Sequence, residues 1–376
     1  MNAKRVFLIV LDSLGAGEAP DAQSFGDVHA HTIKSVYKTG ILKIPNLLKL
    51  GIGNIDGLDF LGRNDAPIAS VARLEEQSAG KDTTTGHWEI CGHVSSMPLP
   101  TFKDGFPEEI TDRLTQVWGC GMLCNKAYSG TAVINDYGEE HMRSGKLIVY
   151  TSADSVLQIA AHVDVVPLET LYGYCRQARE IMQGERYGVG RIIARPFTGN
   201  VGSFERTADR RDFSLYPPDG LLAERLMKKG FDTIAVGKIS DIFAGKGFTE
   251  ERYTHSNEEG TEACSQYQAK EFCGLCFVNL VDFDMLWGHR RDARGYAEGL
   301  NAFDRWLGDF LAGMRDGDML IITADHGCDP SFSKSTDHTR EYVPCIVYSP
   351  NDEAENYGTV KGFYWISDIV LKALGE

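Results

Sequence analysis

The sequence predicts an α/β protein whose core is a mostly parallel β-sheet flanked by helices. Runs of apolar and β-branched residues alternate along the chain with stretches in which apolar residues recur at helical spacing. The apolar runs are nearly continuous, which is typical of strands buried on both faces of a parallel sheet. The chain has 376 residues, more than one hydrophobic core usually serves, so two domains are expected.

Five apolar runs are interpreted as strands. The first, RVFLIVLD at 5–12, is apolar until it ends in an acid. Two later runs repeat this pattern, namely GLCFVNLVDFD at 274–284 and DMLIITADHG at 318–327. A weaker run is DTIAVGKISD at 232–241, and the fifth is YVPCIVYSP at 342–350. Their length and β-branched content favour strands over helices.

Three helices are expected from apolar spacing. In 292–316 the residues at helical spacing are Leu300, Phe303, Leu307, Phe310, Leu311 and Met314. Pro167 opens a second helix over 167–182, because proline is favoured in the first helical turn. A third helix lies near the sequence YWISDIVLKAL at 364–374.

The middle of the chain differs from its two ends. Between about 98 and 216 the predicted strand ends carry no cluster of acids and histidines. Segments rich in Pro and Gly, SSMPLPTFKDGFP and DFSLYPPDG, mark both borders of this region. We therefore expect a core built from 1–98 and 217–376, with residues 99–216 inserted as a smaller α/β cap domain.

Charge and composition exclude several classes of function. The net charge is −15, so a nucleic-acid partner is not expected. The start of the chain has only six consecutive apolar residues before Asp12, too few for a signal peptide or a membrane span, and a cytoplasmic protein is expected. The CxxC at Cys273 and Cys276 is interpreted as buried free thiols, because no second pair accompanies it. One cluster of arginines in the cap region suits a small anion, namely Arg186, Arg191, Arg195, Arg206, Arg210 and Arg211.

Acids and histidines gather where three of the predicted strands end. Ligands of open α/β sheets bind beyond the carboxyl ends of the strands, so these side chains are expected to meet in one crevice. Three carboxylates and three neutral imidazoles suit one or two divalent ions of the Zn, Mn or Fe type. The six residues are Asp12, Asp284, His289, Asp325, His326 and His338.

Each of these residues alone has a simpler interpretation. An acid just past a strand, such as Asp12, is usually a turn former or a helix cap. A lone histidine such as His289 is usually packed and hydrogen-bonded. The adjacent pair Asp325 and His326, after a strand of Leu and Ile, is harder to explain in that way. The agreement of three strand ends favours the metal site.

A second motif, GKDTTTGHWE at 80–89, places three threonines before a Gly-His pair. We expect a first helical turn at GHWEIC, where backbone N–H groups favour a phosphate. A hydroxyl beside a divalent ion is a candidate nucleophile or phosphoryl carrier. For two of the three threonines helix capping is expected instead. No role is assigned to Lys81, Asp82 or His87.

Together these motifs resemble the alkaline phosphatase superfamily of metalloenzymes and, within it, the phosphopentomutase family. The resemblance runs nearly end to end. It is carried by VLDSLGAGEAPDA, GKDTTTGHWEICG, YTSADSVLQIAAH, GRIIARPF, VGKISDIF, VDFDMLWGHRRD and TADHGCDPSFSKSTDHTREYVP. It implies an alkaline-phosphatase-like core with two divalent metal ions, manganese being expected, and a cap domain that binds the sugar.

The resemblance also assigns residues to roles. Asp12, Asp325 and His326 are implied to hold one ion, and Asp284, His289 and His338 the other. By analogy with related phosphoglycerate mutases, Thr83 is the nucleophile, which leaves Thr84 and Thr85 for capping and packing. The family stretches that contact sugar and phosphate match Ser152, Asp154, Arg191 and Lys238.

The implied activity is the interconversion of ribose or deoxyribose 1-phosphate and 5-phosphate. Thr83 is implied to carry a phosphoryl group, a pentose 1,5-bisphosphate is the intermediate, and glucose 1,6-bisphosphate or a similar sugar primes the enzyme. Small pentose phosphates are the expected partners, with no nucleic acid, membrane or obligate protein partner. Two alternatives remain: a metal-dependent phosphatase or other phosphomutase of the same superfamily, and a non-catalytic domain that stores or senses metal.

Overall fold

The computed structural model of the chain describes residues 3–152 and 154–375. The chain divides into two compact units, one formed by residues 1–98 with 217–376 and the other by 99–216. The first unit is called the core and the second the cap. Each is described by itself.

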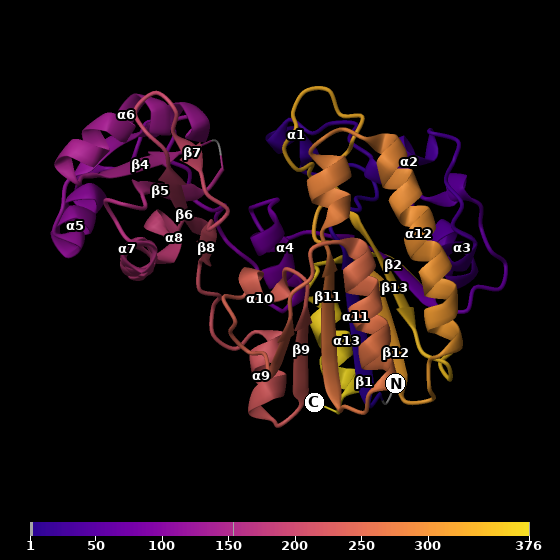
Figure 1. The fold of residues 1–376 in the computed structure, drawn as a ribbon. Helices are drawn as coiled ribbons and strands as arrows, with labels where there is room; N and C mark the ends of the chain where they lie inside the picture. Colours follow the sequence, from indigo (N-terminus) through magenta and orange to yellow (C-terminus); the bar gives the residue numbers. More distant parts are fainter. Residues whose placement is uncertain (1–2, 153, 376) are drawn as a thin grey trace. The chain divides into compact units, whose positions relative to one another are not determined.

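The core is built on an eight-stranded sheet with the order β10-β9-β11-β1-β12-β13-β2-β14 (Figure 1). In chain order its strands are β1 (Arg5–Leu11), β2 (Ser70–Glu75), β9 (Asp232–Val236), β10 (Glu250–Arg252), β11 (Gly274–Leu280), β12 (Asp318–Thr323), β13 (Val343–Tyr348) and β14 (Asn356–Lys361). The five strands from β10 to β12 run parallel, whereas β13 runs antiparallel to both of its neighbours. The predicted α/β fold with a mostly parallel sheet is confirmed.

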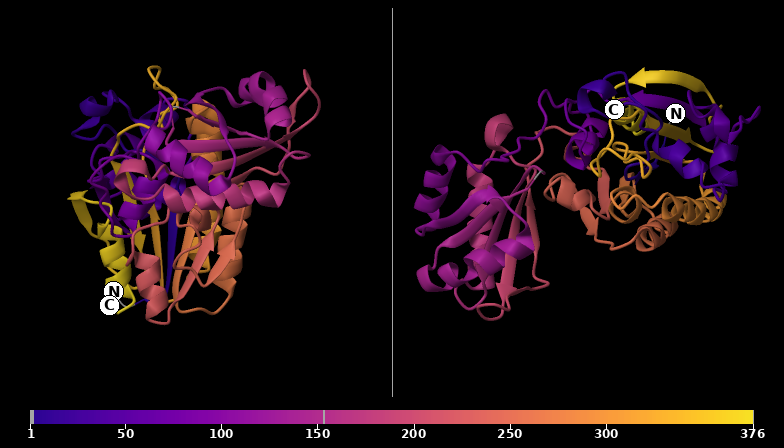
Figure 2. Two further views of the ribbon diagram at one scale, coloured as in Figure 1. Left: turned by 90° about the vertical axis from the view of Figure 1, so that its left-hand side faces the viewer. Right: turned by 90° about the horizontal axis from the view of Figure 1, so that it is seen from above.

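Helices cover both faces of the core sheet. On one face α11 (Asn257–Ala269) packs against β11 and α12 (Ala293–Ala312), and on the other α9 (Leu222–Lys228) packs with α13 (Trp365–Ala373) (Figures 1 and 2). Every residue of β1, β11 and β12 is buried, which explains their continuous apolar sequences. The remaining helical segments of the core are α1 (Ala22–Phe25), α2 (Thr32–Tyr37), α3 (Pro45–Leu50), η1 (Ile52–Asn54), η2 (Asp59–Leu61), α4 (Thr83–Ile90), α10 (Ile239–Ile242) and η3 (Phe283–Gly288).

The cap has its own sheet, with the order β3-β4-β5-β6-β7 and with β8 also pairing with β6. Its strands are β3 (Met122–Ala127), β4 (Leu147–Thr151), β5 (Val156–His162), β6 (Arg191–Thr198), β7 (Glu205–Arg206) and β8 (Arg211–Ser214). Its helices are α5 (Glu108–Trp118), α6 (Gly130–Ser144), α7 (Leu168–Ile181) and α8 (Gly184–Tyr187).

Alternating side chains give the cap two apolar layers. On β4, Leu147 and Val149 pack with α5 and α7, whereas Ile148 and Tyr150 pack with α6 on the opposite face. This follows from the two-residue period of a strand. The cap is therefore a sheet covered by helices on both faces (Figure 2).

The five predicted strands and the three predicted helices are all present. The run at 232–241 was interpreted as too long a strand, because β9 ends at Val236 and α10 begins at Ile239. The sequence analysis missed three core strands, β2, β10 and β14. Polar residues interrupt the buried sequence of β2, and β10 and β14 consist largely of exposed residues. One expectation was wrong: Cys273 precedes its strand and is exposed, although Cys276 is buried. Among the described residues, no helix is both long enough and apolar enough to cross a membrane.

Candidate active site

The carboxyl ends of β11, β1 and β12 lie side by side at one edge of the core sheet. The three strands are parallel and in register, with Leu11 beside Leu280 and Val10 beside Thr323. Asp12 follows β1 directly, and β12 leads through one alanine to Asp325 and His326. The chain after β11 enters a π-helical turn, η3, a conformation that is frequent at functional sites.

One cluster at this edge consists of Asp12, Asp325 and His326. All three are buried, and one potential ligand atom of each lies within 4.8 Å of the others. The His326 Nε2 atom lies 3.2 Å from Asp325 Oδ2 and 3.6 Å from Asp12 Oδ1. This arrangement directs one nitrogen and two carboxylates toward a common point.

A second cluster consists of Asp284, His289 and His338, again within 4.8 Å of one another. Asp284 lies in η3, and His289 is the first residue after η3. This turn therefore supplies two of the three side chains. The Nε2 atoms of the two histidines lie 3.1 Å apart, and each is 3.3–3.4 Å from an oxygen of Asp284.

The two clusters are neighbours. The rings of His326 and His338 stack with their centroids 3.8 Å apart. The charge of Asp284 also acts on Asp12. The six residues that the sequence analysis grouped at the strand ends therefore lie in one site, and their role as metal ligands stays a prediction.

Backbone carbonyls orient all three histidines in the same way. In each ring Nδ1 faces a carbonyl oxygen: that of Gly327 for His326, Thr336 for His289 and Lys81 for His338, at 3.1, 2.7 and 3.1 Å. In the neutral ring, an Nδ1–H that donates to a carbonyl leaves Nε2 as the nitrogen without a proton, which is the form that binds a metal. In each case Nε2 is the atom that points into its cluster.

The charges of the site show how crowded its carboxylates are. Burial, together with the charges of Asp325 and Asp284, raises the pKa of Asp12 to about 7. Burial favours a neutral His326, but Asp325 and Asp12 hold its pKa well above the usual range. The hydrogen bond to Asp284 raises the pKa of His289 to about 11. Protons on the histidines offset carboxylate charge here, as a bound cation would.

Unpartnered oxygen atoms provide a test of whether the residues fit a metal. Asp12 Oδ1, Asp284 Oδ1 and Asp325 Oδ2 are buried and accept no hydrogen bond from any described residue. A buried carboxylate oxygen without a donor is costly unless it is paired or binds an ion. One carboxylate-rich set and one histidine-rich set, both of O and N donors, suit divalent ions such as Mn²⁺ or Zn²⁺. The residues therefore fit two such ions.

Two buried side chains that the sequence analysis did not assign support the first cluster. Asn279 Nδ2 donates to Asp12 Oδ2 at 2.9 Å. His87 is fully buried, and its Nδ1 lies 3.2 Å from Asp325 Oδ2 and 2.9 Å from the Thr83 carbonyl oxygen. The sequence signal for Asn279 was a polar residue within an apolar strand. The signal for His87 was the Gly-His pair.

The threonine motif begins α4, and two expectations about it were wrong. The helix starts at Thr83 rather than at Gly86, and its N-cap is Asp82, whose side chain accepts from the Thr85 N–H at 3.1 Å. No threonine caps the helix, because the carboxylate of Asp82 is available one residue earlier. The Thr85 hydroxyl instead donates to Asp82 at 2.7 Å.

Thr83 lies at the metal-ligand clusters. Its Oγ1 atom is 3.2 Å from His326 Nε2, the atom that points into the first cluster. Gly86 permits this approach, because a Cβ at that position would lie 2.0 Å from the Asp325 carbonyl oxygen. Thr83 thus stands in the first turn of a helix that packs directly against a metal-ligand strand end.

The predicted substrate-binding residues fall in both units. In the core, Lys238 is half-buried at the start of α10. Its positive charge acts to lower the pKa of Asp12, against the rise that burial and the neighbouring carboxylates cause. In the cap, Ser152 and Asp154 follow the end of β4, and Arg191 begins β6 opposite Val156, the first residue of β5. The three cap residues therefore share one edge of the cap sheet. Asp154 is exposed, and Arg191 lies 3.5 Å from Asp212.

The arginine cluster is partly gathered in the cap. Burial raises the pKa of the Tyr150 phenol, and the nearby charges of Arg206, Arg195 and Arg210 oppose that rise. Arg210 forms an ion pair with Asp212 at 2.7 Å. These contacts concentrate positive charge on one side of the cap sheet, and anion binding there stays a prediction.

Comparison with known proteins agrees with this geometry. The pattern that defines the Metalloenzyme superfamily matches residues 4–375. The chain is 55% identical over 371 residues to a phosphopentomutase of Lachnoclostridium phytofermentans, covering 98% of this chain and 95% of that protein. The chain belongs to the phosphopentomutase family. A phosphopentomutase of Clostridium novyi is 51% identical, covering 96% of this chain and 92% of that protein.

Membership of the phosphopentomutase family makes the chain an enzyme of the isomerase class. Among solved structures, a phosphoglycerate mutase of Leishmania mexicana has a TM-score of 0.47 at 12% identity, covering all of this chain and 96% of that one. The resemblance to metalloenzymes that the motifs carry is confirmed, and divalent metal use agrees with the two ligand clusters.

Proposed function

We propose that the enzyme interconverts ribose or deoxyribose 1-phosphate and 5-phosphate, with Thr83 as the residue that carries the phosphoryl group. The position of Thr83 carries this proposal. Its hydroxyl oxygen lies 3.2 Å from a ring nitrogen of the first cluster, at the start of a helix whose N–H groups favour a phosphate. High identity to phosphopentomutases supports the reaction itself.

Two metal ions, with manganese expected, belong to the proposal. Asp12, Asp325 and His326 would hold one, and the other set would hold the second, namely Asp284, His289 and His338. When bound, such ions neutralise the charge of a phosphoryl group and of the oxygens that exchange it. The histidine orientation described above leaves one nitrogen of each ring available for this purpose.

The reaction is written as two phosphoryl transfers. In the first, the P–O bond to Thr83 breaks and a P–O bond forms at the sugar 1-hydroxyl of a pentose 5-phosphate, giving a 1,5-bisphosphate. The proton lost by the sugar hydroxyl balances the one gained by the threonine oxygen. In the second, Thr83 takes the phosphoryl group from position 5, which leaves the 1-phosphate. The enzyme returns to its phosphorylated form, so a bisphosphorylated sugar such as glucose 1,6-bisphosphate is needed only for priming.

The cap is proposed to bind the sugar. Ser152, Asp154 and Arg191 share one edge of its sheet, where hydroxyl, carboxylate and guanidinium groups suit sugar hydroxyls and a phosphate. Lys238 is proposed to meet a phosphate in the core, where its charge already acts on Asp12. Small pentose phosphates are the proposed partners.

Mass spectrometry of the intact protein tests the proposal. The full chain is incubated with Mn²⁺ and glucose 1,6-bisphosphate, and fragmentation then locates any added phosphoryl group. We expect the group on Thr83 and conversion of ribose 5-phosphate to ribose 1-phosphate. Thr83→Ala should lose both, whereas Thr84→Ala, the matched change one residue on, should keep both.

Two results would contradict the proposal. Added mass on Thr84 or Thr85 would move the phosphoryl carrier to a neighbouring residue. Rapid release of inorganic phosphate from ribose phosphates, with no interconversion, would instead identify a phosphatase of the same superfamily.

A further inference from the structure

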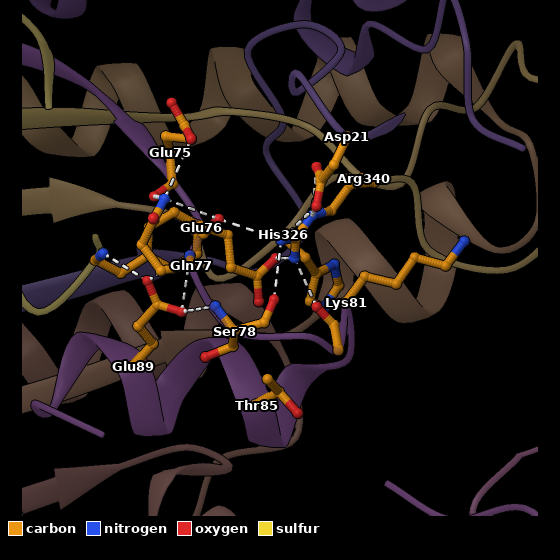
Figure 3. Close-up of polar contacts among 12 residues, drawn as sticks. Asp21, Glu75, Glu76, Gln77, Ser78, Lys81, Thr85, Glu89, His326 and Arg340 are labelled. Carbon is orange, nitrogen blue, oxygen red and sulfur yellow. Dashed lines mark hydrogen bonds and ion pairs between the residues drawn. The ribbon is translucent and has the colours of Figure 1, made fainter. Parts of the chain in front are cut away.

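The segment that leads into α4, residues 76–82, is held in place from more than one side. Two of its residues, Gln77 and Ser78, lie between two charged side chains, Glu89 and Arg340, that approach from different directions (Figure 3). Both are buried, Glu89 with no exposed surface and Arg340 with 2%. A buried charge has to be balanced by hydrogen bonds or by an opposite charge, and these two meet that need largely through the segment.

Arg340 binds three alternate carbonyl oxygens of this segment. Its Nη1 donates to Gly80 at 2.6 Å, and its Nη2 donates to Ser78 at 2.8 Å and to Glu76 at 3.1 Å. The guanidinium also pairs with the buried carboxylate of Glu76 and, through Nε at 3.0 Å, with Asp21. These contacts use the fixed fork of arginine donors on one short stretch of backbone.

The same extended stretch that carries Arg340 also carries the metal-ligand candidate His338. Two residues apart, their side chains lie on one side of that stretch, as expected from the period of an extended chain. His338 Nδ1 faces the carbonyl oxygen of Lys81 at 3.1 Å. Lys81 directly follows Gly80, the last of the three residues whose carbonyl oxygens bind Arg340. Asp27 adds a further tie, because it accepts from the Arg340 N–H at 2.9 Å and from Lys81 Nζ at 2.8 Å.

Glu89 holds the segment from the other side. It accepts from the Gln77 N–H at 2.9 Å and the Ser78 N–H at 2.7 Å, and from the Phe363 N–H at 2.9 Å. Glu89 is part of α4, so the helix that begins with Thr83 is hydrogen-bonded to Gln77 and Ser78 in the segment that precedes it. The position of Thr83 is therefore tied to whatever holds residues 76–81, and Arg340 supplies three of those bonds.

We propose that Arg340 is a positioning residue for phosphoryl transfer. By holding residues 76–80 against the stretch that carries His338, it sets the distance between Thr83 and the metal ligands. The proposal rests on the proposed function, because it takes Thr83 as the phosphoryl carrier. Arg340 does not touch the reacting atoms and acts through the backbone alone.

The substitution Arg340→Lys tests this role. Lysine keeps a positive charge for Glu76, but its single ammonium cannot span three carbonyls as the guanidinium does. We expect kcat for ribose 5-phosphate to fall on the order of 10- to 100-fold, the size of effect that a displacement near 1 Å produces. KM should stay near the wild-type value, because the sugar contacts do not change. The loss of kcat should persist at Mn²⁺ concentrations that calorimetry shows to be saturating, because all six ligand side chains are retained.

Two further variants separate positioning from simple stabilisation. Asp21→Asn removes a half-exposed partner of the same guanidinium but none of the carbonyl bonds, and it should keep wild-type turnover. The double variant E76Q/R340Q removes both buried charges together, so no unpaired ion is left to unfold the chain. It should show the kcat loss of Arg340→Lys with a folded circular dichroism spectrum.

Three results would overturn the proposal. Arg340→Lys and E76Q/R340Q with wild-type kcat would show that Thr83 needs no such support. A loss of Mn²⁺ affinity that accounts for the lost turnover would place the effect on the ligands instead. An equal kcat loss in Asp21→Asn would reduce Arg340 to general stabilisation. A wild-type enzyme without a phosphoryl group on Thr83 would be a separate result, since it contradicts the proposed function before any variant is made.

Discussion

Buried histidines occur in both units of this enzyme, and their surroundings differ. In the core, His326 has one ring nitrogen near a backbone carbonyl and the other facing two carboxylates. In the cap, His162 satisfies both nitrogens with backbone: Nε2 faces the Gly199 carbonyl at 3.0 Å, and Nδ1 accepts from the Asp164 N–H at 3.2 Å. Each of the two residues is only 1% exposed.

The partners of its two ring nitrogens distinguish a structural buried histidine from a candidate metal ligand. His141, a second buried histidine of the cap, also uses both nitrogens on backbone groups, those of Lys146 and His162. Burial lowers the pKa of His141, whereas neighbouring carboxylates raise that of His326. A ring with both nitrogens satisfied supports the fold, and a ring with one nitrogen aimed at carboxylates has the arrangement that a metal ligand needs.

The largest effect is expected from replacing His326 of the core by glutamine, with the same replacement of His162 in the cap as its control. His326→Gln should lower Mn²⁺ affinity by more than the roughly 10- to 100-fold that loss of an outer partner costs, and turnover should be lost with it. His162→Gln should leave Mn²⁺ affinity unchanged, because both nitrogens of its ring are hydrogen-bonded to backbone groups. Isothermal calorimetry of both variants checks this. Equal losses in the two would show that the comparison does not separate ligands from structural histidines.

A smaller effect is expected at Asn279, which holds Asp12 by a single hydrogen bond. Asn279→Ala should weaken Mn²⁺ binding roughly 10- to 100-fold, since outer-shell partners orient the ligands. Gln158→Ala is the matched change in the cap, where the amide accepts from Arg195, and it should leave Mn²⁺ binding at the wild-type level. A wild-type metal affinity in Asn279→Ala would mean that Asp12 is oriented without it.

The smallest effect concerns the cap histidine His141. His141→Ala leaves the buried N–H of His162 without its acceptor and should cost roughly 1–3 kcal/mol of local stability. Because burial lowers the pKa of His141 below 6.5, the unfolded chain binds a proton more readily, so this contribution to stability is present above pH 6.5 and is lost as the pH falls.

Hydrogen exchange of peptides from β5 checks both parts of this prediction. In the wild-type chain, protection of residues 156–162 should fall between pH 7.5 and 5.5 after correction for intrinsic exchange. In His141→Ala protection should be lower at both pH values and should change less between them. A variant as pH-sensitive as the wild type would assign the acid sensitivity to another group.

The sequence predicted those parts of the molecule whose residue pattern is typical of a single kind of structure. Buried parallel strands give unbroken apolar runs, and an acid at the end of such a run marks the edge of the sheet. The β1 and β12 runs and the acids that follow them were recognised in this way. Edge strands such as β14 were missed, because their exposed positions are polar and carry no distinct period.

The supporting residues of the site could not be predicted, since their partners are distant in sequence. His87 meets Asp325 only after helix α4 has packed against the end of β12, and its sequence neighbours give no sign of that contact. The start of α4 was misplaced for a related reason. Asp82 and the threonines are all good caps, and only the Thr85 bonds decide between them.

The central place of β1 has a consequence for how the enzyme is made. This strand precedes every other described strand in the chain, yet its sheet partners are β11 and β12, and Arg5 bonds Asp318 across 313 residues of sequence. Domains tend to fold in the order in which they leave the ribosome, so the inserted cap can complete its own sheet while β1 still waits for its neighbours. A chain released before β12 would carry Asp12 and Thr83 but neither Asp325 nor His326. The end of the sheet that carries both acid–histidine clusters is therefore completed only after the cap, and a chain that stops before β12 has the whole cap sequence but lacks Asp325, His326 and His338.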